Sequence, residues 1–178
     1  MTVYQPSIDA DLLLLNWYYT MATCEDFEMV FSSELAPCSS FMASMRSCTL
    51  IYEVDEKGIW FAAWFDRVMC AGAYGFWVRA DKRDSPGGGE PLRAALESLR
   101  FGLSRFPVLL FVTKQPEIVT LSLRVGFVPL GDIPWLFDGE SASVAWLDAA
   151  RFNQYNPAPH VEAFVPENAT PPVEELHG

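Results

Sequence analysis

The sequence predicts one α/β domain with a single twisted sheet, followed by an extended tail. Strand-like runs come first and then alternate with helical patterns, an order that is typical of this class. Hydrophobic residues make up 51% of the 178 residues and charged residues only 20%, so the chain can bury a sizeable core. We expect the domain over residues 1–150 and the tail over 151–178, where prolines are frequent and apolar periodicity is lost.

The N-terminal part is expected to be helical. The segment LLLLNWYYTMA carries the helix, and Asp9 or Asp11 is the expected N-cap. The Ser/Pro/Cys-rich segment Ser32–Ser47 predicts a loop with a short helix. The apolar stretch is too short for a membrane span and no basic residue precedes it, so we expect no membrane partner and a soluble chain in the cytoplasm.

Three strand-like runs follow. The segment TLIYEVDEKGIWFAAWFD predicts a hairpin, because an acidic turn ending in Gly58 separates two β-branched and aromatic runs. The third run, VMCAGAYGFWVR, contains Gly72 and Gly75. Glycines inside a strand often mark a bulge or a close approach by another chain or a ligand.

The second half alternates helix and strand. The segment DSPGGG breaks regular structure, and Pro91 stands at a first helical position before the amphipathic LRAALESLRFGLSRF. Val108–Thr113 predicts a buried strand, and a helix over Glu117–Val125 is expected to end at Gly126. Two more strands are expected, over Phe127–Leu130 and Ala142–Leu147.

The net charge and the types of side chain present limit the classes of function that the chain can have. A net charge of −11 argues against nucleic-acid binding; it fits a solvated acidic surface or a basic partner, and a nucleic-acid mimic is a further alternative. The four cysteines show no CxxC spacing, and both histidines, His160 and His177, lie in the tail. We therefore expect no metal site and no histidine base in the domain.

Residues 48 to 148 resemble the GNAT superfamily of N-acetyltransferases. Three features carry the resemblance: the segment LRVGFVPLGDIP, the glycine-rich loop that opens a helix, and the helix before Gly126 and Phe127. The resemblance implies a GNAT-like mixed, mostly antiparallel twisted sheet flanked by helices. It also implies a site for acyl-CoA.

The resemblance assigns residues to that site. The backbone of the third strand-like run would pair with the pantetheine arm, and the glycine loop would hold the pyrophosphate at a helix N-terminus. Gln115 stands where the family commonly has an asparagine, and Ser122 stands where it has a tyrosine that protonates the thiolate. The residues implied for acyl-CoA binding are Phe76, Val78, Arg83, Gly87, Gly88, Gly89 and Gln115.

No strong catalytic group is evident. The candidates are Tyr74, Asp81 and Ser122, although Tyr74 also suits a core or groove-lining position and Asp81 a loop cap. The first hypothesis is therefore a non-catalytic binding or assembly module with a degenerate acyl-CoA site and no cofactor, resembling GNAT-like proteins of tailed-bacteriophage virions. Its tail would bind a protein partner or a second copy, within a virion or in the cytoplasm. The alternative is an acetyl-CoA-dependent N-acyltransferase acting on a small amine or a protein amine.

Overall fold

The computed structural model describes residues 1–3, 8–24, 26–31, 37–83, 89–137 and 140–157. Three of the expectations fall partly outside these ranges. Gly87 and Gly88 of the glycine loop are not among the described residues, nor are positions 32–36 of the expected loop Ser32–Ser47, nor is the tail from position 158 onward. The strands, the helices and the candidate residues other than these two glycines lie within them.

Within the described residues, seven strands form one mixed sheet in the order β1-β2-β3-β4-β5-β7-β6. Neighbouring strands are antiparallel except for β4 and β5, which are parallel, so the expected mixed, mostly antiparallel architecture is confirmed. The strands are β1 (Thr2–Val3), β2 (Thr49–Asp55), β3 (Gly58–Val68), β4 (Ala71–Val78), β5 (Val108–Thr113), β6 (Val128–Phe137) and β7 (Glu140–Asp148).

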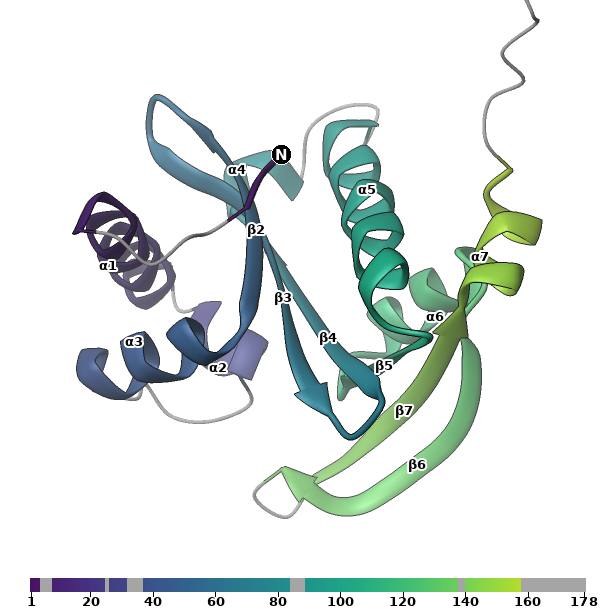
Figure 1. Cartoon of the computed structure of the whole chain (residues 1–178). Helices are drawn as coiled ribbons and strands as arrows, with labels where there is room; N and C mark the ends of the chain where they lie inside the picture. Colours follow the sequence, from purple (N-terminus) through teal and green to yellow (C-terminus); the bar gives the residue numbers. More distant parts are fainter. Residues whose placement is uncertain (4–7, 25, 32–36, 84–88, 138–139, 158–178) are drawn as a thin grey trace, which may run out of the picture.

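Helices cover both faces of this sheet (Figure 1). One layer holds α1 (Ile8–Thr23), α2 (Asp26–Phe31) and α3 (Cys38–Ser47), and the other holds α5 (Gly89–Arg105), α6 (Pro116–Arg124) and α7 (Ala149–Tyr155). A short helix, α4 (Ala80–Arg83), follows β4. None of the helices in the described ranges has the length and apolar character needed to cross a bilayer.

Two hydrophobic cores lie on opposite faces of the sheet, and β3 contributes to both. Phe61 and Phe65 pack into the core beneath α5, whereas Ala62 packs into the core beneath α1. Because successive side chains of a strand point to opposite faces, a strand that is covered on both sides must be apolar at nearly every position. This explains the unbroken run IWFAAWF within β3.

The structure corrects the boundaries of several elements, among them β6, which runs on to Phe137 where the sequence predicts an end at Leu130. Helix α1 begins at Ile8, so Asp9 and Asp11 lie inside its first turn and neither is the N-cap. The third strand-like run is also divided: Val68 ends β3, and β4 begins at Ala71 after a tight turn in which Met69 has a φ of 58°. A methionine rarely takes positive φ, and the turn contains no glycine, asparagine or aspartate that would have marked it.

The packed domain continues past Arg151. Helix α7 runs to Tyr155, its N-cap Asp148 accepts a hydrogen bond from the backbone N–H of Arg151 at 2.8 Å, and Phe152 is buried in the core beneath α5. The helix is short and its one buried residue gives no periodic signal, so the sequence pattern alone places residues 151–155 in the tail.

Candidate functional site

The edge of β4 is only partly paired with β5. The pairing runs from Gly72–Leu109 to Tyr74–Phe111, and among the described residues β4 continues to Val78 without a partner on this side. The backbone N–H of Arg79 donates to Trp60 of β3 at 2.8 Å. Because backbone groups alternate along a strand, those of Phe76 and Val78 point the other way, toward β5. We call residues 75–78 the unpaired edge.

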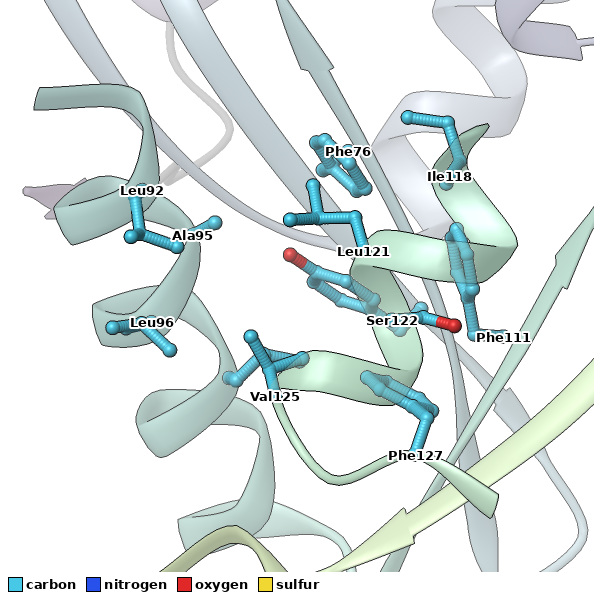
Figure 2. Close-up of a pocket in the computed structure, with 12 residues that line it drawn as sticks. Phe76, Leu92, Ala95, Leu96, Phe111, Ile118, Leu121, Ser122, Val125 and Phe127 are labelled. Carbon is cyan, nitrogen blue, oxygen red and sulfur yellow. The ribbon is translucent and has the colours of Figure 1, made fainter. Parts of the chain in front are cut away.

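An apolar groove lies between α5 and α6, above β4 and β5 (Figure 2). Its floor contains the ring of Phe76, stacked between Tyr74 and Phe111 with centroid distances of 5.9 and 6.0 Å. Its cavity measures only about 40 Å³, and Leu92 and Leu121 remain 45% and 41% exposed. The lining residues are Tyr74, Phe76, Leu92, Ala95, Leu96, Leu99, Phe111, Ile118, Leu121, Ser122, Val125 and Phe127.

The two hydroxyl groups in this lining are both hydrogen-bonded. The Tyr74 hydroxyl lies 2.8 Å from the Oγ atom of Ser98, which in turn donates to the carbonyl oxygen of Ala95 at 2.7 Å. Burial raises the pKa of Tyr74 well above its usual value. The Ser122 hydroxyl donates to the carbonyl oxygen of Val119 at 2.7 Å. Neither group is therefore an effective acid or base near neutral pH.

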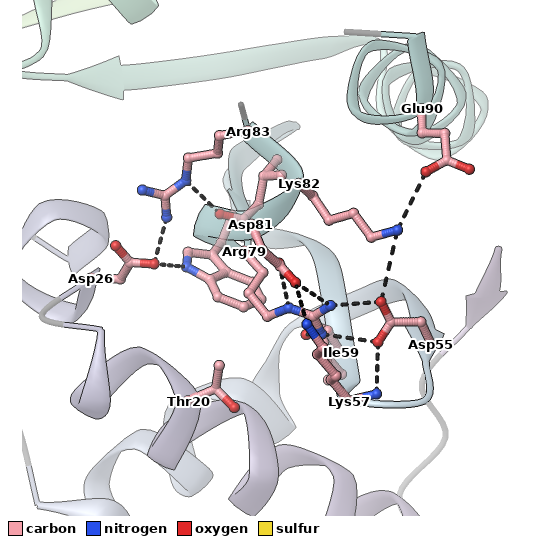
Figure 3. Close-up of polar contacts among 12 residues, drawn as sticks. Thr20, Asp26, Asp55, Lys57, Ile59, Arg79, Asp81, Lys82, Arg83 and Glu90 are labelled. Atoms are coloured by element: carbon pink, nitrogen blue, oxygen red, sulfur yellow. Dashed lines mark hydrogen bonds and ion pairs between the residues drawn. The ribbon is translucent and has the colours of Figure 1, made fainter. Parts of the chain in front are cut away.

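Arg83 lies at the end of the unpaired edge (Figure 3). Its Nε atom donates to the carbonyl oxygen of Val78 at 2.6 Å, and its guanidinium also forms an ion pair with Asp26 of α2. Asp26 is 5% exposed and accepts a second hydrogen bond from the Nε1 atom of Trp77 at 2.8 Å. The sequence pointed to Arg83 but not to Asp26, since no local pattern distinguishes this buried carboxylate.

Asp81 belongs to a different cluster, centred on the buried Arg79 (Figure 3). Arg79 forms ion pairs with Asp81 at 2.7 Å and with Asp55 at 2.6 Å, and Lys57 lies 3.2 Å from Asp81. Hydrogen bonding from Arg79 lowers the pKa of Asp81 to about 2. So strongly stabilised a carboxylate is a weak base, and Asp81 does not line the groove. The position of Asp81 beside Arg79 favours a structural role.

The remaining predicted residues lie near the helix starts. Gly89 is the first residue of α5, and a Cβ atom at this position would meet nothing within 4 Å. Gln115 is the N-cap of α6, and its backbone N–H donates to the Oγ1 atom of Thr113 at 3.1 Å. The structure thus brings Tyr74, Phe76 and Ser122 together in the groove.

Comparison with known proteins gives a consistent result for the fold. No protein-family model matches the chain, and no curated protein matches it in sequence. A putative acetyltransferase from Acinetobacter baylyi has a similar structure, with a TM-score of 0.63 and 15% identity over 84% of this chain and 93% of its own. A ribosomal-protein-alanine N-acetyltransferase from Brucella melitensis is also similar, with a TM-score of 0.60 and 13% identity. The match covers 83% of this chain and 99% of the Brucella protein.

A third similar structure is a microcin self-immunity acetyltransferase in complex with acetyl-CoA and AMP. It gives a TM-score of 0.57 and 15% identity over 83% of this chain and 91% of its own. The expected resemblance to bacteriophage virion proteins finds no support in these structures. At such low identity they establish the architecture alone. The chain has the fold of the GNAT acetyltransferases.

Proposed function

We propose that this protein is an acetyl-CoA-dependent N-acyltransferase that binds the acyl-CoA beside the unpaired edge. The observation that carries the proposal is the end of β4–β5 pairing at Tyr74 and Phe111. Beyond this point, both backbone groups of Phe76 and the N–H of Val78 face the space beside β5, while the Val78 carbonyl oxygen accepts a hydrogen bond from Arg83. An extended ligand with amide groups can pair with them as an added strand would.

The residues around the unpaired edge have the chemical character that such a ligand needs. The apolar groove would cover the pantetheine arm, and Arg83 would face the pyrophosphate. In size the groove is a tight fit, because a cavity of about 40 Å³ is far smaller than the roughly 300 Å³ of common ligand pockets. The exposed side chains of Leu92 and Leu121 would therefore rotate outward on binding, as side chains at binding surfaces often do.

Positioning is the main catalytic contribution that these residues offer. Bound acetyl-CoA would supply a thioester, and the neutral form of an amine would attack its carbonyl carbon. The C–N bond would form as the C–S bond breaks, and water would carry the amine's proton to the departing thiolate, which leaves as free CoA. Holding two reactants in a productive geometry lowers the barrier substantially without an added acid or base. Catalysis by positioning is consistent with the groove, because the Tyr74 and Ser122 hydroxyls are already hydrogen-bonded and supply no acid or base. The net charge of −11 favours a cationic amine as acceptor.

One pair of observations favours a second candidate, an assembly module that does not transfer acyl groups. The groove is small, and Arg83 is already paired with Asp26. In this case the tail would bind a protein partner or a second copy. The hypothesis that the protein is part of a bacteriophage virion is supported by the sequence resemblance alone.

Calorimetric titration with acetyl-CoA, followed by a transfer assay on a panel of small amines, tests the proposal. The variant Ala95→Trp fills the groove and should abolish both binding and transfer. Ala43→Trp makes the same change on the exposed surface of α3 and should preserve both. Wild-type protein that does not bind acetyl-CoA supports the second candidate and contradicts the proposed function. Binding without transfer to any amine contradicts the transferase activity alone.

A further inference from the structure

A second cavity, of about 260 Å³, lies between α6 and the strands β5, β6 and β7. Phe111 and Ser122 line both this cavity and the apolar groove, so they form the partition between the two. Figure 2 shows the Ser122 hydroxyl turned away from α5, on the Phe111 side of the groove. The cavity is lined by Phe111, Thr113, Val119, Ser122, Leu123, Pro129, Gly131, Asp132, Ser143, Val144 and Ala145.

One wall of the second cavity is polar. Ser143 of β7 pairs with Thr113 on one side and with Asp132 on the other, so three polar residues lie side by side across three strands. The Ser143 hydroxyl donates to the Oδ1 atom of Asp132 at 2.6 Å. This bond fixes the orientation of the carboxylate, and no described residue bonds to its Oδ2 atom.

The rest of the lining is largely apolar. Val119 and Leu123 contribute from α6, and Pro129 contributes from β6, the strand that also carries Asp132. A ligand in this cavity would therefore contact a carboxylate at one end and hydrocarbon along the rest of its length.

Asp132 is exposed, and its carboxylate forms no ion pair in the described part of the chain. None of the lining residues is a lysine or an arginine, and none of the described cations forms an ion pair with Asp132. The nearby Lys114 is instead paired with Glu140 at 3.0 Å. An exposed carboxylate with no ion-pair partner, beside an apolar surface, suits a cation that carries an apolar body.

We propose that the second cavity binds a small organic cation, a primary amine on an apolar stem, with the ammonium group at Asp132. The volume accommodates a molecule of roughly ten non-hydrogen atoms, because small-molecule pockets of a few hundred Å³ hold ligands of that size. The inference goes beyond the proposed acyltransferase activity. Ser122 and Phe111 separate this cavity from the groove, so the amine binds here whether or not acyl-CoA does.

Titration with phenethylamine and with its neutral counterpart 2-phenylethanol tests the proposal, using amide chemical shifts of the whole chain as the readout. The amine should bind more tightly than the alcohol and should shift the signals of Thr113, Val119 and Ser143. Asp132→Asn should weaken amine binding about tenfold and leave alcohol binding unchanged, the scale expected for a charged hydrogen bond.

Glu117→Gln is the matched control, because it removes an exposed carboxylate of α6 that does not line the cavity and has no ion pair among the described residues. It should leave the amine affinity unchanged. Equal affinity of the wild-type protein for the two probes would overturn the proposal. So would undiminished amine binding by the folded Asp132→Asn variant, or shifts confined to residues outside the cavity.

Discussion

The Nε atom of Arg83 donates a hydrogen bond to the carbonyl oxygen of Val78 at 2.6 Å, at the far end of the unpaired edge. This carbonyl points toward β5, because it belongs to the same alternating set as Phe76. A guanidinium thus stands where the two parallel strands are no longer paired. Its second partner, Asp26, belongs to α2, in the helical layer that covers the face of the sheet away from the apolar groove.

Substitution of Arg83 tests its proposed contact with acyl-CoA. Arg83→Ala should weaken acetyl-CoA binding by about 1–3 kcal/mol in calorimetry, the scale of a charged hydrogen bond. Arg93→Ala is the control, since it removes the same charge from the exposed surface of α5. Equal losses in the two variants would mean that only long-range charge matters, and no loss in Arg83→Ala would mean that the contact is not made.

A methyl group at Gly75 is expected to disrupt the aromatic core on the α1 face. A Cβ atom there would lie 2.3 Å from the Trp64 ring, too close for any real contact. Gly75→Ala should therefore cost about 1–3 kcal/mol in the free energy of unfolding, measured by denaturant titration. Gly89→Ala meets open space and should cost nothing. A Gly75→Ala variant as stable as the wild type would show that Trp64 moves freely.

The ion pairs of Arg79 predict a loss of stability in acid. Arg79 lowers the pKa of Asp81 to about 2 and also lowers the pKa of Asp55. An aspartate in the unfolded chain has a pKa of about 3.9. The stabilisation is therefore complete above about pH 4 and is lost as the pH falls toward about 2. We expect the thermal unfolding temperature to fall over this range.

Replacing the carboxylate should flatten this acid dependence. Asp81→Asn should lower the unfolding temperature near neutral pH and reduce its fall in acid, because one proton-linked contact is gone. Asp66→Asn alters an exposed carboxylate of β3 that has no ion pair among the described residues, so it serves as the control. An unchanged acid profile in Asp81→Asn would contradict the assignment.

Truncation separates the domain from the proposed binding segment. Deleting everything after Asn156 should leave the unfolding temperature unchanged, because Phe152 and the contact of the Asn156 side chain with Val125 both remain. The same deletion should abolish association with a partner or a second copy, measured by analytical ultracentrifugation. Phe152→Ala should instead cost about 3–5 kcal/mol of stability. A truncated protein that still associates normally would exclude a role for the tail.

The sequence predicted the fold best where local signals were strong. The strand Val108–Thr113 is continuously apolar, and Gly126 takes the positive φ of 106° that ends α6, so this segment was predicted with nearly correct limits. The turn at Met69 was missed because its residues carry no turn signal. A close approach at Gly75 is expected from the sequence, and the ring of Trp64 makes one.

The site was predictable only in part, because its geometry depends on contacts between distant segments. Arg83 could be found from the glycine loop that follows it, but its partner Asp26 lies 57 residues earlier in the chain. The second cavity depends on the register that aligns Ser143 with Asp132 and Thr113. Such a register comes from strand pairing in three dimensions, and no local spacing encodes it.

The alternation of Phe61 and Ala62 between two cores has a consequence for how the molecule opens. Because one strand anchors both helical layers, neither layer can detach without exposing apolar surface on β3. We expect the backbone amides of β3 to exchange with deuterium most slowly and only by global unfolding. The two helical layers should then lose protection together, as one cooperative unit.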